Sequence, residues 1–377
     1  MHVVIAIDSF KGSLTSLQAG SAIKDAALKV DANSDVTIIP LADGGEGTVD
    51  ALSCCLSGEI IETDVKGPLG EPVKAKYYLL DDKTAIIEMA EASGITLVPE
   101  EKRNPLHTTT YGVGELIKDA IDRGSRNFIV GIGGSATNDG GTGMLNALGF
   151  EFTDKDGQNI SFGAVGLSEL FKISVNNVIP ELKNCKFRIA CDVINPLCGE
   201  NGCSKIFGPQ KSGTPEMIEN MDLWLKNYSE LCKTVSQNVQ PDFPGSGAAG
   251  GLGFAFLTFT DSVLESGFKI VSDITKLEEH IKNADIVVTG EGRLDKQTAM
   301  GKAPIGVAEL AKKHNKKVIA FSGVVSHDAE ICNKHGIDAY FPILREITTV
   351  EKAMETNYAY KNLSDTAYQV FRLLEQE

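Results

Sequence analysis

Residues 285–295 read DIVVTGEGRLD, an apolar strand pattern that runs into glycines, carboxylates and an arginine. Two more apolar runs follow at 317–321 and 339–343, and helical patterns separate the three. Near the amino end, 3–7 and 36–41 are apolar runs with another helical pattern between them. Five strands that alternate with helices predict an α/β fold, with a flavodoxin-like parallel sheet of order 2-1-3-4-5.

The middle of the chain has a different pattern. Successive strand patterns joined by turn signals favour antiparallel pairing, and they lie at 60–65, 73–80 and 84–89. Further helical and strand patterns follow at 113–122, 127–130, 187–190 and 215–226. We therefore expect two domains: a discontinuous flavodoxin-like domain at 1–58 plus 283–377, and an inserted α+β domain at 59–282.

Composition narrows the class of partner. The 377 residues carry a formal net charge of -15, which would repel nucleic acid and anionic membrane surfaces. We see no signal-peptide pattern and no apolar stretch that approaches the length of a membrane span. The eight cysteines include no CxxC pair, so reduced thiols are expected. These features favour a cytoplasmic protein with small-molecule ligands, with neither nucleic acid nor membrane as partner.

Four segments rich in glycine and carboxylates follow apolar strands, where α/β proteins present ligand-binding loops. They are DSFKGS at 8–13, ADGGEGT at 42–48, GIGGSATNDGGTG at 131–143, and TGEGRLD at 289–295. In a sheet of order 2-1-3-4-5 the ligand crevice opens between the carboxyl ends of the first and third strands. We therefore expect the first and last segments to meet, with the second beside them and the third facing them across a cleft between the domains.

Each segment also has a structural interpretation. The first resembles a capped helix start with a solvated lysine, the second a simple turn, and the last a surface salt-bridge cluster. The glycine run contains Gly131-x-Gly133-x-x-Ala136, a loose dinucleotide-binding pattern that is frequent by chance. Motifs of P-loop enzymes, protein kinases, zinc proteases and serine hydrolases are missing from the sequence. Acids, glycines and a few cations suit phosphoryl transfer, in which positioning and charge neutralisation do most of the catalysis.

Seven motifs, in order and over almost the whole chain, resemble the bacterial glycerate kinases. They are DSFKGSLT (8–15), ADGGEGT (42–48), GGSATNDGGTGML (133–145), CDVINPLCGENG (191–202), FGPQK (207–211), GAAGGLG (247–253) and TGEGRLDKQTAMGKAP (289–304). The resemblance implies a flavodoxin-like domain with an insertion similar to a restriction-endonuclease fold. It also implies ATP with Mg²⁺ and D-glycerate as acceptor, with 2-phosphoglycerate favoured over 3-phosphoglycerate as product. Cys203 and Ser212 depart from the usual alanine and glycine, and both flank the motif cores.

Roles can be assigned as hypotheses. Arg293, with Lys11 or Lys296, would hold the glycerate carboxylate, because a planar bidentate donor suits that group. Ser9 lies beside Lys11 in the same predicted substrate pocket. Asp8 or Asp295 would accept the hydroxyl proton as general base. The predicted catalytic group is therefore Asp8, Lys11, Arg293 and Asp295.

The nucleotide is assigned to the glycine run and the metal to carboxylates. Backbone and side-chain groups expected to contact ATP are Gly133, Gly134, Ser135, Asn138, Asp139, Gly140 and Gly141. Ligands expected to hold Mg²⁺ are Asp43, Glu46, Asp192 and Glu291. Two alternatives stay open at this point. One is an NAD(P)-dependent hydroxy-acid oxidoreductase, and the other is a non-catalytic glycerate sensor.

Overall fold

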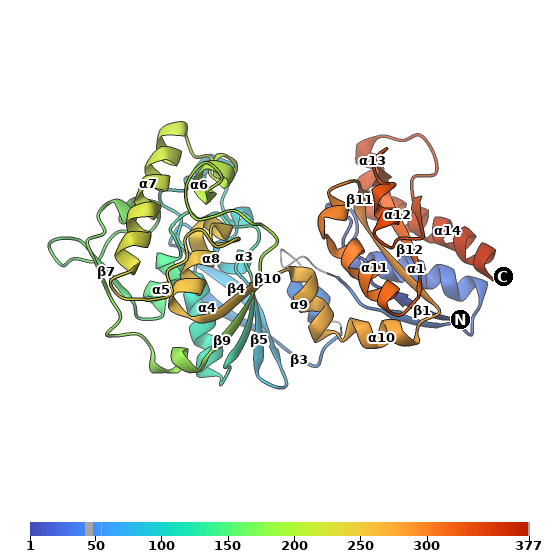
Figure 1. The fold of residues 1–377 in the computed structure, drawn as a ribbon, viewed down its shortest axis with the longest axis horizontal. Helices are drawn as coiled ribbons and strands as arrows, with labels where there is room; N and C mark the ends of the chain where they lie inside the picture. Colours follow the sequence, from blue (N-terminus) through green and yellow to red (C-terminus); the bar gives the residue numbers. More distant parts are fainter. Residues whose placement is uncertain (42–47, 54, 376–377) are drawn as a thin grey trace. The chain divides into compact units, whose positions relative to one another are not determined.

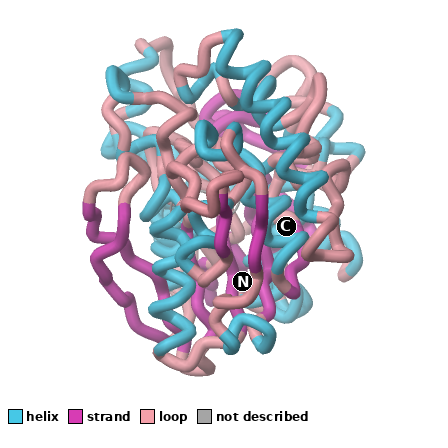
Figure 2. The backbone as a smooth tube through the Cα atoms, turned by 90° about the vertical axis from the view of Figure 1, so that its left-hand side faces the viewer, coloured by secondary structure: helices cyan, strands magenta, loops and turns pink. Residues whose placement is uncertain are grey.

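The computed structural model describes residues 1–41, 48–53 and 55–375 of the chain. It is a mixed α/β protein of two compact units, each with a large sheet (Figure 1, Figure 2). Unit 1 comprises residues 1–43, 50–56 and 268–377, and unit 2 comprises residues 44–49 and 57–267. The chain re-enters unit 1 at Phe268, earlier than the expected position 283, so the third strand of unit 1 is preceded by helical residues of the same unit.

The sheet of unit 1 has five parallel strands in the order β2-β1-β11-β12-β13. The strands are β1 (His2–Ile5), β2 (Asp35–Ile38), β11 (Ile286–Leu294), β12 (Lys317–Val325) and β13 (Ala339–Pro342). Numbered within the unit, this order is 2-1-3-4-5, which confirms the prediction. It results from pairing the two ends of the chain: Val3 aligns with Ile286 and Ile5 with Val288.

Strand β11 is longer than expected. The sequence predicted a strand that ends at Thr289 and a ligand loop after it, but β11 continues through Glu291 and Arg293. The reason is pairing, since Gly290 lies opposite Phe321 and Glu291 opposite Ser322 on β12. Gly290 has φ +155, and a Cβ there would collide with the carbonyl oxygen of Phe321. Glycine is therefore needed for this close approach, and the segment is an extended strand end and not a free loop.

Helices cover both faces of the unit 1 sheet. On one face, α1 (Ser16–Val30) and α14 (Thr356–Leu374) lie side by side (Figure 1) and pack against Val3, Ile5 and Phe321. Thr15 begins α1 with a capping box, in which its side chain and that of Gln18 bond each other's backbone N–H groups. The other helices are α2 (Thr48–Ser53), α9 (Gly267–Ile274), α10 (Leu277–Asn283), α11 (Ala303–Lys313), α12 (Ile331–Lys334) and α13 (Val350–Met354).

The sheet of unit 2 has six strands in the order β10-β9-β6-β5-β4-β3. They are β3 (Gly58–Lys66), β4 (Pro72–Leu80), β5 (Thr84–Glu88), β6 (Asn127–Gly131), β9 (Lys186–Ala190) and β10 (Asp261–Glu265). The pairs β3–β4 and β4–β5 are antiparallel, as the turn signals predicted, and the remaining pairs are parallel. The strands β7 (Glu151–Thr153) and β8 (Lys172–Ser174) form a separate two-stranded antiparallel sheet.

The core of unit 2 follows the alternation of its strands. Tyr77, Ile87, Phe128 and Phe187 come from four neighbouring strands and are buried in one apolar cluster, and each contributes about 1.5–3 kcal/mol to folding. The helices are α3 (Ala90–Ser93), α4 (Tyr111–Asp122), α5 (Thr142–Ala147), α6 (Cys203–Phe207), α7 (Pro215–Cys232) and α8 (Ala248–Phe259). In the described part of the chain, none of the helices has the length and apolar character needed to cross a membrane.

Candidate active site

In unit 1, the first and last of the glycine-rich segments lie against each other. The backbone N–H of Asp8 donates to the carbonyl of Gly290 at 3.0 Å, which continues the pairing of β1 with β11. A Cβ at Gly292 would lie 3.4 Å from the Cα of Phe10 and 3.6 Å from the backbone nitrogen of Lys11. The two segments therefore meet at the carboxyl end of the sheet, where ligands of such sheets bind.

The loop after β1 is a closed turn. Phe10 and Leu14 exchange backbone hydrogen bonds of 2.8 and 3.0 Å, and both side chains are buried. Between them, Gly12 adopts φ +76, a conformation that suits glycine. The carboxylate of Asp8 accepts a hydrogen bond of 2.6 Å from the backbone N–H of Ser9. This anchoring leaves the side chain of Lys11 exposed at the tip of a rigid turn.

Glu291 is buried and has two partners on the following segment. Its Oε1 accepts a 2.6 Å hydrogen bond from the hydroxyl of Thr298, and its Oε2 lies 3.3 Å from Nζ of Lys302. Neither partner was among the predicted site residues. The only sequence signal was their position inside the motif 289–304, which contains a Gly-Lys pair without the other features of a P-loop. Glu291 is therefore an ion-paired carboxylate on a strand.

Arg293 and Asp295 form the second charged group of unit 1. Nε of Arg293 lies 3.4 Å from Oδ2 of Asp295, while Oδ1 of Asp295 accepts from the backbone nitrogen of Gln297 at 2.8 Å. The Arg293 side chain is 67% exposed, so most of its five N–H donors face solvent and can bind an anion. Lys296, which follows Asp295, is also exposed.

In unit 2, the glycine run begins where β6 ends, and backbone bonds hold its first part. The N–H of Ile95 donates to Gly134 at 2.8 Å, and the N–H of Ala136 donates to Ser93 at 2.9 Å. Gly134 adopts φ +71 and is exposed, whereas Ser135 is only 9% exposed. Of the residues predicted to contact the nucleotide, Gly133 and Gly134 are thus the most accessible.

The second part of the run points inward. Asp139 is fully buried, and its carboxylate accepts hydrogen bonds from Thr110, at the backbone nitrogen (2.8 Å) and the hydroxyl (2.9 Å), and from Gly141 N (3.1 Å). Burial raises the pKa of Asp139, although these hydrogen bonds oppose the shift. The Asn138 amide donates to Ser204 at 2.9 Å. Asn138 and Asp139 therefore support the loop from within, and their direct contact with a nucleotide stays a prediction.

Gly140 and Gly141 pack against a second glycine-rich segment, at the start of α8. Gly140 N–H donates to the carbonyl of Gly250 at 2.9 Å. Residues 249–251 all have left-handed backbone angles, which are unusual for Ala249. A Cβ at Gly141 or Gly250 would collide with Ala255 or with the backbone of Thr137. The two motifs 133–145 and 247–253 therefore form one backbone-to-backbone unit, which explains their glycine content.

The carboxyl ends of four parallel strands of unit 2 share one edge, because Glu88, Gly131, Ala190 and Glu265 are register partners. The glycine run begins at this edge, after Gly131. Asp192 also lies near it, two residues after Ala190. Asp192 is exposed, and its Oδ1 accepts from Gly267 N at 3.1 Å. Val49, the residue after the motif 42–48, is bound to the same edge, because its backbone N–H donates to Oε1 of Glu88 at 2.6 Å.

The predicted metal ligands are only partly described. Asp43 and Glu46 lie outside the described residues, Glu291 belongs to unit 1 and Asp192 to unit 2. Within residues 1–41, 48–53 and 55–375, no three His, Cys, Asp or Glu side chains gather into a metal-binding cluster. A ready-made protein cage is therefore missing from the described residues.

The dinucleotide alternative does not match the local structure. Its fingerprint requires a helix that opens within the glycine pattern. Here β6 ends at Gly131 and the next helix, α5, starts only at Thr142. Residues 133–136 are irregular backbone bonded to Ser93 and Ile95.

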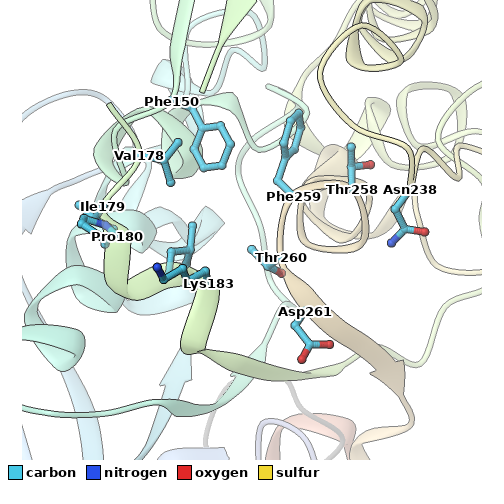
Figure 3. A pocket seen from close by; sticks show the side chains of 11 residues that line it. Phe150, Val178, Ile179, Pro180, Lys183, Asn238, Thr258, Phe259, Thr260 and Asp261 are labelled. Carbon is cyan, nitrogen blue, oxygen red and sulfur yellow. The ribbon is translucent and has the colours of Figure 1, made fainter. Parts of the chain in front are cut away.

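One apolar hollow in unit 2 lies elsewhere. Phe150 and Phe259 line it and pack edge to face with ring centroids 5.1 Å apart, and Asp261 is also among the lining residues (Figure 3). Asp261 begins β10, at the amino end of the parallel strands. The hollow is thus at the opposite end of the sheet from the glycine run and is not part of the candidate site.

Comparisons with known proteins agree over the whole chain. The model of the glycerate kinase family matches residues 3–375. A glycerate kinase of Haemophilus influenzae is 48% identical over 375 residues, which cover 99% of either chain. A glycerate 2-kinase of Escherichia coli K12 is 47% identical over 359 residues, covering 95% of this chain and 94% of the relative. The crystal structure of a Salmonella typhimurium LT2 protein provisionally named glycerate kinase 2 is 44% identical, with a TM-score of 0.89 and coverage of 100% and 98%.

Proposed function

The chain belongs to the glycerate kinase family, and from that premise we propose that it is a glycerate 2-kinase. The enzyme transfers the terminal phosphoryl group of ATP to the 2-hydroxyl of D-glycerate and releases 2-phosphoglycerate. The observation that carries this proposal, beside the family, is the meeting of residues 8–11 with residues 290–295 at the carboxyl end of one sheet. A reaction that consumes ATP is expected in the cytoplasm.

We assign the glycerate carboxylate to Arg293, assisted by Lys11 or Lys296, with Ser9 beside them. The exposed guanidinium of Arg293 is oriented by Asp295 at 3.4 Å and by Ser326 at 3.4 Å, so its remaining donors are preorganised for a carboxylate. Holding the carboxylate fixes the position of the 2-hydroxyl on the adjacent carbon. This orientation lowers the entropic part of the barrier.

Asp8 or Asp295 acts as the general base that accepts the hydroxyl proton. Both carboxylates are oriented by backbone N–H donors, Asp8 by Ser9 and Asp295 by Gln297. Asp295 additionally faces Arg293, so its second oxygen is engaged by a cation. The variants Asp8→Asn and Asp295→Asn distinguish the two candidates. Replacement of the true base should lower kcat and leave the glycerate KM nearly unchanged.

The nucleotide phosphates are assigned to the glycine run, with Gly133, Gly134 and Ser135 as contacts. Asn138, Asp139, Gly140 and Gly141 support the loop. Mg²⁺ fits the donor chemistry, because Asp43, Glu46, Asp192 and Glu291 are carboxylates and Mg²⁺ prefers oxygen ligands. Since Mg²⁺ is usually held by one or two carboxylates together with substrate phosphates, a preformed protein cage is not required. When bound, the ion neutralises charge on the β- and γ-phosphates.

Lys302 and Glu291 supply a further part of the acceptor side. The buried carboxylate of Glu291, two residues before Arg293 on β11, holds the ammonium of Lys302 at 3.3 Å. A cation in this position can stabilise negative charge that develops on the transferring group. We also infer that unit 2, with its six-stranded mixed sheet, is similar to a restriction-endonuclease fold.

Phosphorus NMR of the product tests the proposed function. The protein is incubated with D-glycerate, ATP and Mg²⁺, and ADP release is followed in parallel. Phosphate on carbon 2 couples to a single proton and gives a doublet, whereas phosphate on carbon 3 couples to two protons and gives a triplet. A triplet would reassign the product to 3-phosphoglycerate, and an absence of turnover would reject the kinase assignment.

A further inference from the structure

Lys211 is a buried lysine next to the glycine run. It ends the short helical turn η5 (Pro209–Lys211) in unit 2, and only 2% of it is exposed. Its ammonium donates to the hydroxyl oxygen of Ser135 at 2.9 Å and to the carbonyl of Thr137 at 2.6 Å. Lysine is almost never fully buried unless its charge has partners. The two hydrogen bonds of Lys211 are therefore what allows its ammonium to be buried beside the glycine run.

The contact determines how Ser135 can act. An ammonium group has three donors and no acceptor, so the oxygen of Ser135 must be the acceptor in this bond. The hydroxyl proton of Ser135 is then directed away from Lys211. The backbone on both sides is also tied down, because Gly134 accepts from Ile95 N and Ala136 N donates to Ser93. Ser135 is therefore a hydroxyl with a defined position and a defined donor direction.

We propose that Lys211 is a positioning residue for nucleotide binding, which holds Ser135 so that its hydroxyl donates to a phosphate oxygen of ATP. The inference rests on the proposed function, since it assigns the nucleotide phosphates to the glycine run. With its side chain covered, Lys211 acts through Ser135 and Thr137 and does not itself contact the phosphate. A charge-assisted bond to the serine oxygen also polarises the O–H group and strengthens its donation.

A purely structural role makes different predictions. Lys211 faces two titratable groups, Asp139 on the glycine run and Cys203 on α6, and it could serve only to balance the buried Asp139. In that case, replacing Lys211 would lower stability and would not weaken ATP binding more than glycerate binding. If Lys211 orients Ser135, its removal weakens ATP binding and leaves glycerate binding unchanged.

Titration provides an independent readout. Burial lowers the pKa of Lys211 to about 8, although the negative charge of Asp139 opposes this shift. The thiol of Cys203 has its own pKa raised by burial to about 11, so it stays neutral over most of the range concerned. Raising the pH from 7 to 9 should therefore neutralise Lys211 and raise the KM for ATP. In Ser135→Ala this step should be absent.

The decisive experiment is a double-mutant cycle with Ser135→Ala, Lys211→Met and the double variant. For each full-length protein, we would measure the KM for ATP, the KM for glycerate, the calorimetric affinity for ATP, and stability in urea. Each single variant should raise the KM for ATP by about tenfold, which is typical of one lost hydrogen bond to a charged group, and leave the glycerate KM within about twofold. The double variant should be little worse than either, because both remove the same contact.

The matched control is Tyr77→Phe, which removes the 2.6 Å hydrogen bond from Tyr77 to Asp119 in the same unit and should leave both KM values unchanged.

An unchanged ATP KM in Lys211→Met, equal increases in both KM values, or additive effects would overturn the inference. If Lys211→Met fails to fold, the pH dependence of wild type against Ser135→Ala decides, and a step retained in Ser135→Ala overturns it. Absence of turnover in wild type would reject the proposed function alone, and the calorimetric ATP affinities would still decide on Lys211.

Discussion

The backbone N–H of Asp8, in the segment that follows β1, donates to the carbonyl of Gly290 in the middle of β11. This bond joins the two ends of the chain and aligns the loop after β1 with the charged end of β11. Six charged residues of unit 1 therefore lie in the segments that meet at one edge of the sheet: Asp8, Lys11, Glu291, Arg293, Asp295 and Lys302.

Arg293→Ala should raise the KM for glycerate by roughly ten- to a hundredfold, which corresponds to about 1.5–3 kcal/mol for a lost hydrogen bond to a charged group. The KM for ATP should change little. Arg345→Ala is the control, because Arg345 is also an exposed arginine of unit 1 and pairs with Asp365 at 2.8 Å. Steady-state kinetics check both, and a glycerate KM that stays at the wild-type value would remove Arg293 from the substrate pocket.

Glu291→Gln should lower kcat by about tenfold or more, because neutralising the buried carboxylate releases Lys302 from its position. Lys302→Met should produce a similar loss. Lys352→Met is the matched control, since Lys352 forms a surface pair with Glu346 at the same distance of 3.3 Å. Measured kcat values that are equal to wild type in both Glu291→Gln and Lys302→Met would show that this pair is only structural.

Gly290→Ala should destabilise the protein by about 1–3 kcal/mol or more, since the new methyl group overlaps the backbone of Phe321. Gly292→Ala, on the same strand, should cost much less, because its Cβ would meet its nearest neighbour at 3.4 Å, an ordinary contact. Urea denaturation of both variants tests this difference. Equal midpoints would mean that β11 and β12 do not approach as closely as described.

Asp139→Asn should reduce stability by about 1–3 kcal/mol, because the amide replaces one carboxylate oxygen with a donor and leaves a buried N–H or hydroxyl of Thr110 or Gly141 without its acceptor. Asp154→Asn is the control: Asp154 also accepts backbone hydrogen bonds, from Asp156 and Gln158, but at an exposed turn. Differential scanning calorimetry compares the two. A wild-type melting temperature for Asp139→Asn would argue against a buried anionic network.

The pH dependence of stability should report Lys211. Its folded pKa of about 8 lies below the ordinary value of 10.5, so between these values the unfolded chain holds more protons than the folded one. The free energy of unfolding should therefore rise with pH across this window, by up to about 1.4 kcal/mol per pH unit from this group. Urea denaturation of wild type and Lys211→Met isolates the contribution as a difference. Parallel curves from pH 8 to 10 would contradict it.

Much of the architecture could be predicted from local sequence patterns. Five apolar runs separated by helical patterns were enough for the strand order, because parallel strands with helical crossovers have few allowed arrangements. The same reasoning predicts that residues 8–11 and 290–295 lie close together at the carboxyl end of the sheet. The family followed from seven ordered motifs, and the comparisons confirm it. The similarity of unit 2 to a restriction-endonuclease fold and the individual roles of the site residues stay predictions.

Only the tertiary structure decided which side chains of the motifs face inward and which partners they have. The sequence indicates that residues 131–143 form a glycine-rich loop, but not that Asp139 turns to Thr110 or that Lys211 reaches Ser135. Likewise, β11 continues past Gly290 because β12 lies beside it, and Glu291 meets Lys302 because the chain turns back after the strand. Composition and periodicity are local properties of the chain, whereas burial and charge pairing depend on residues that are distant in sequence and adjacent only after folding.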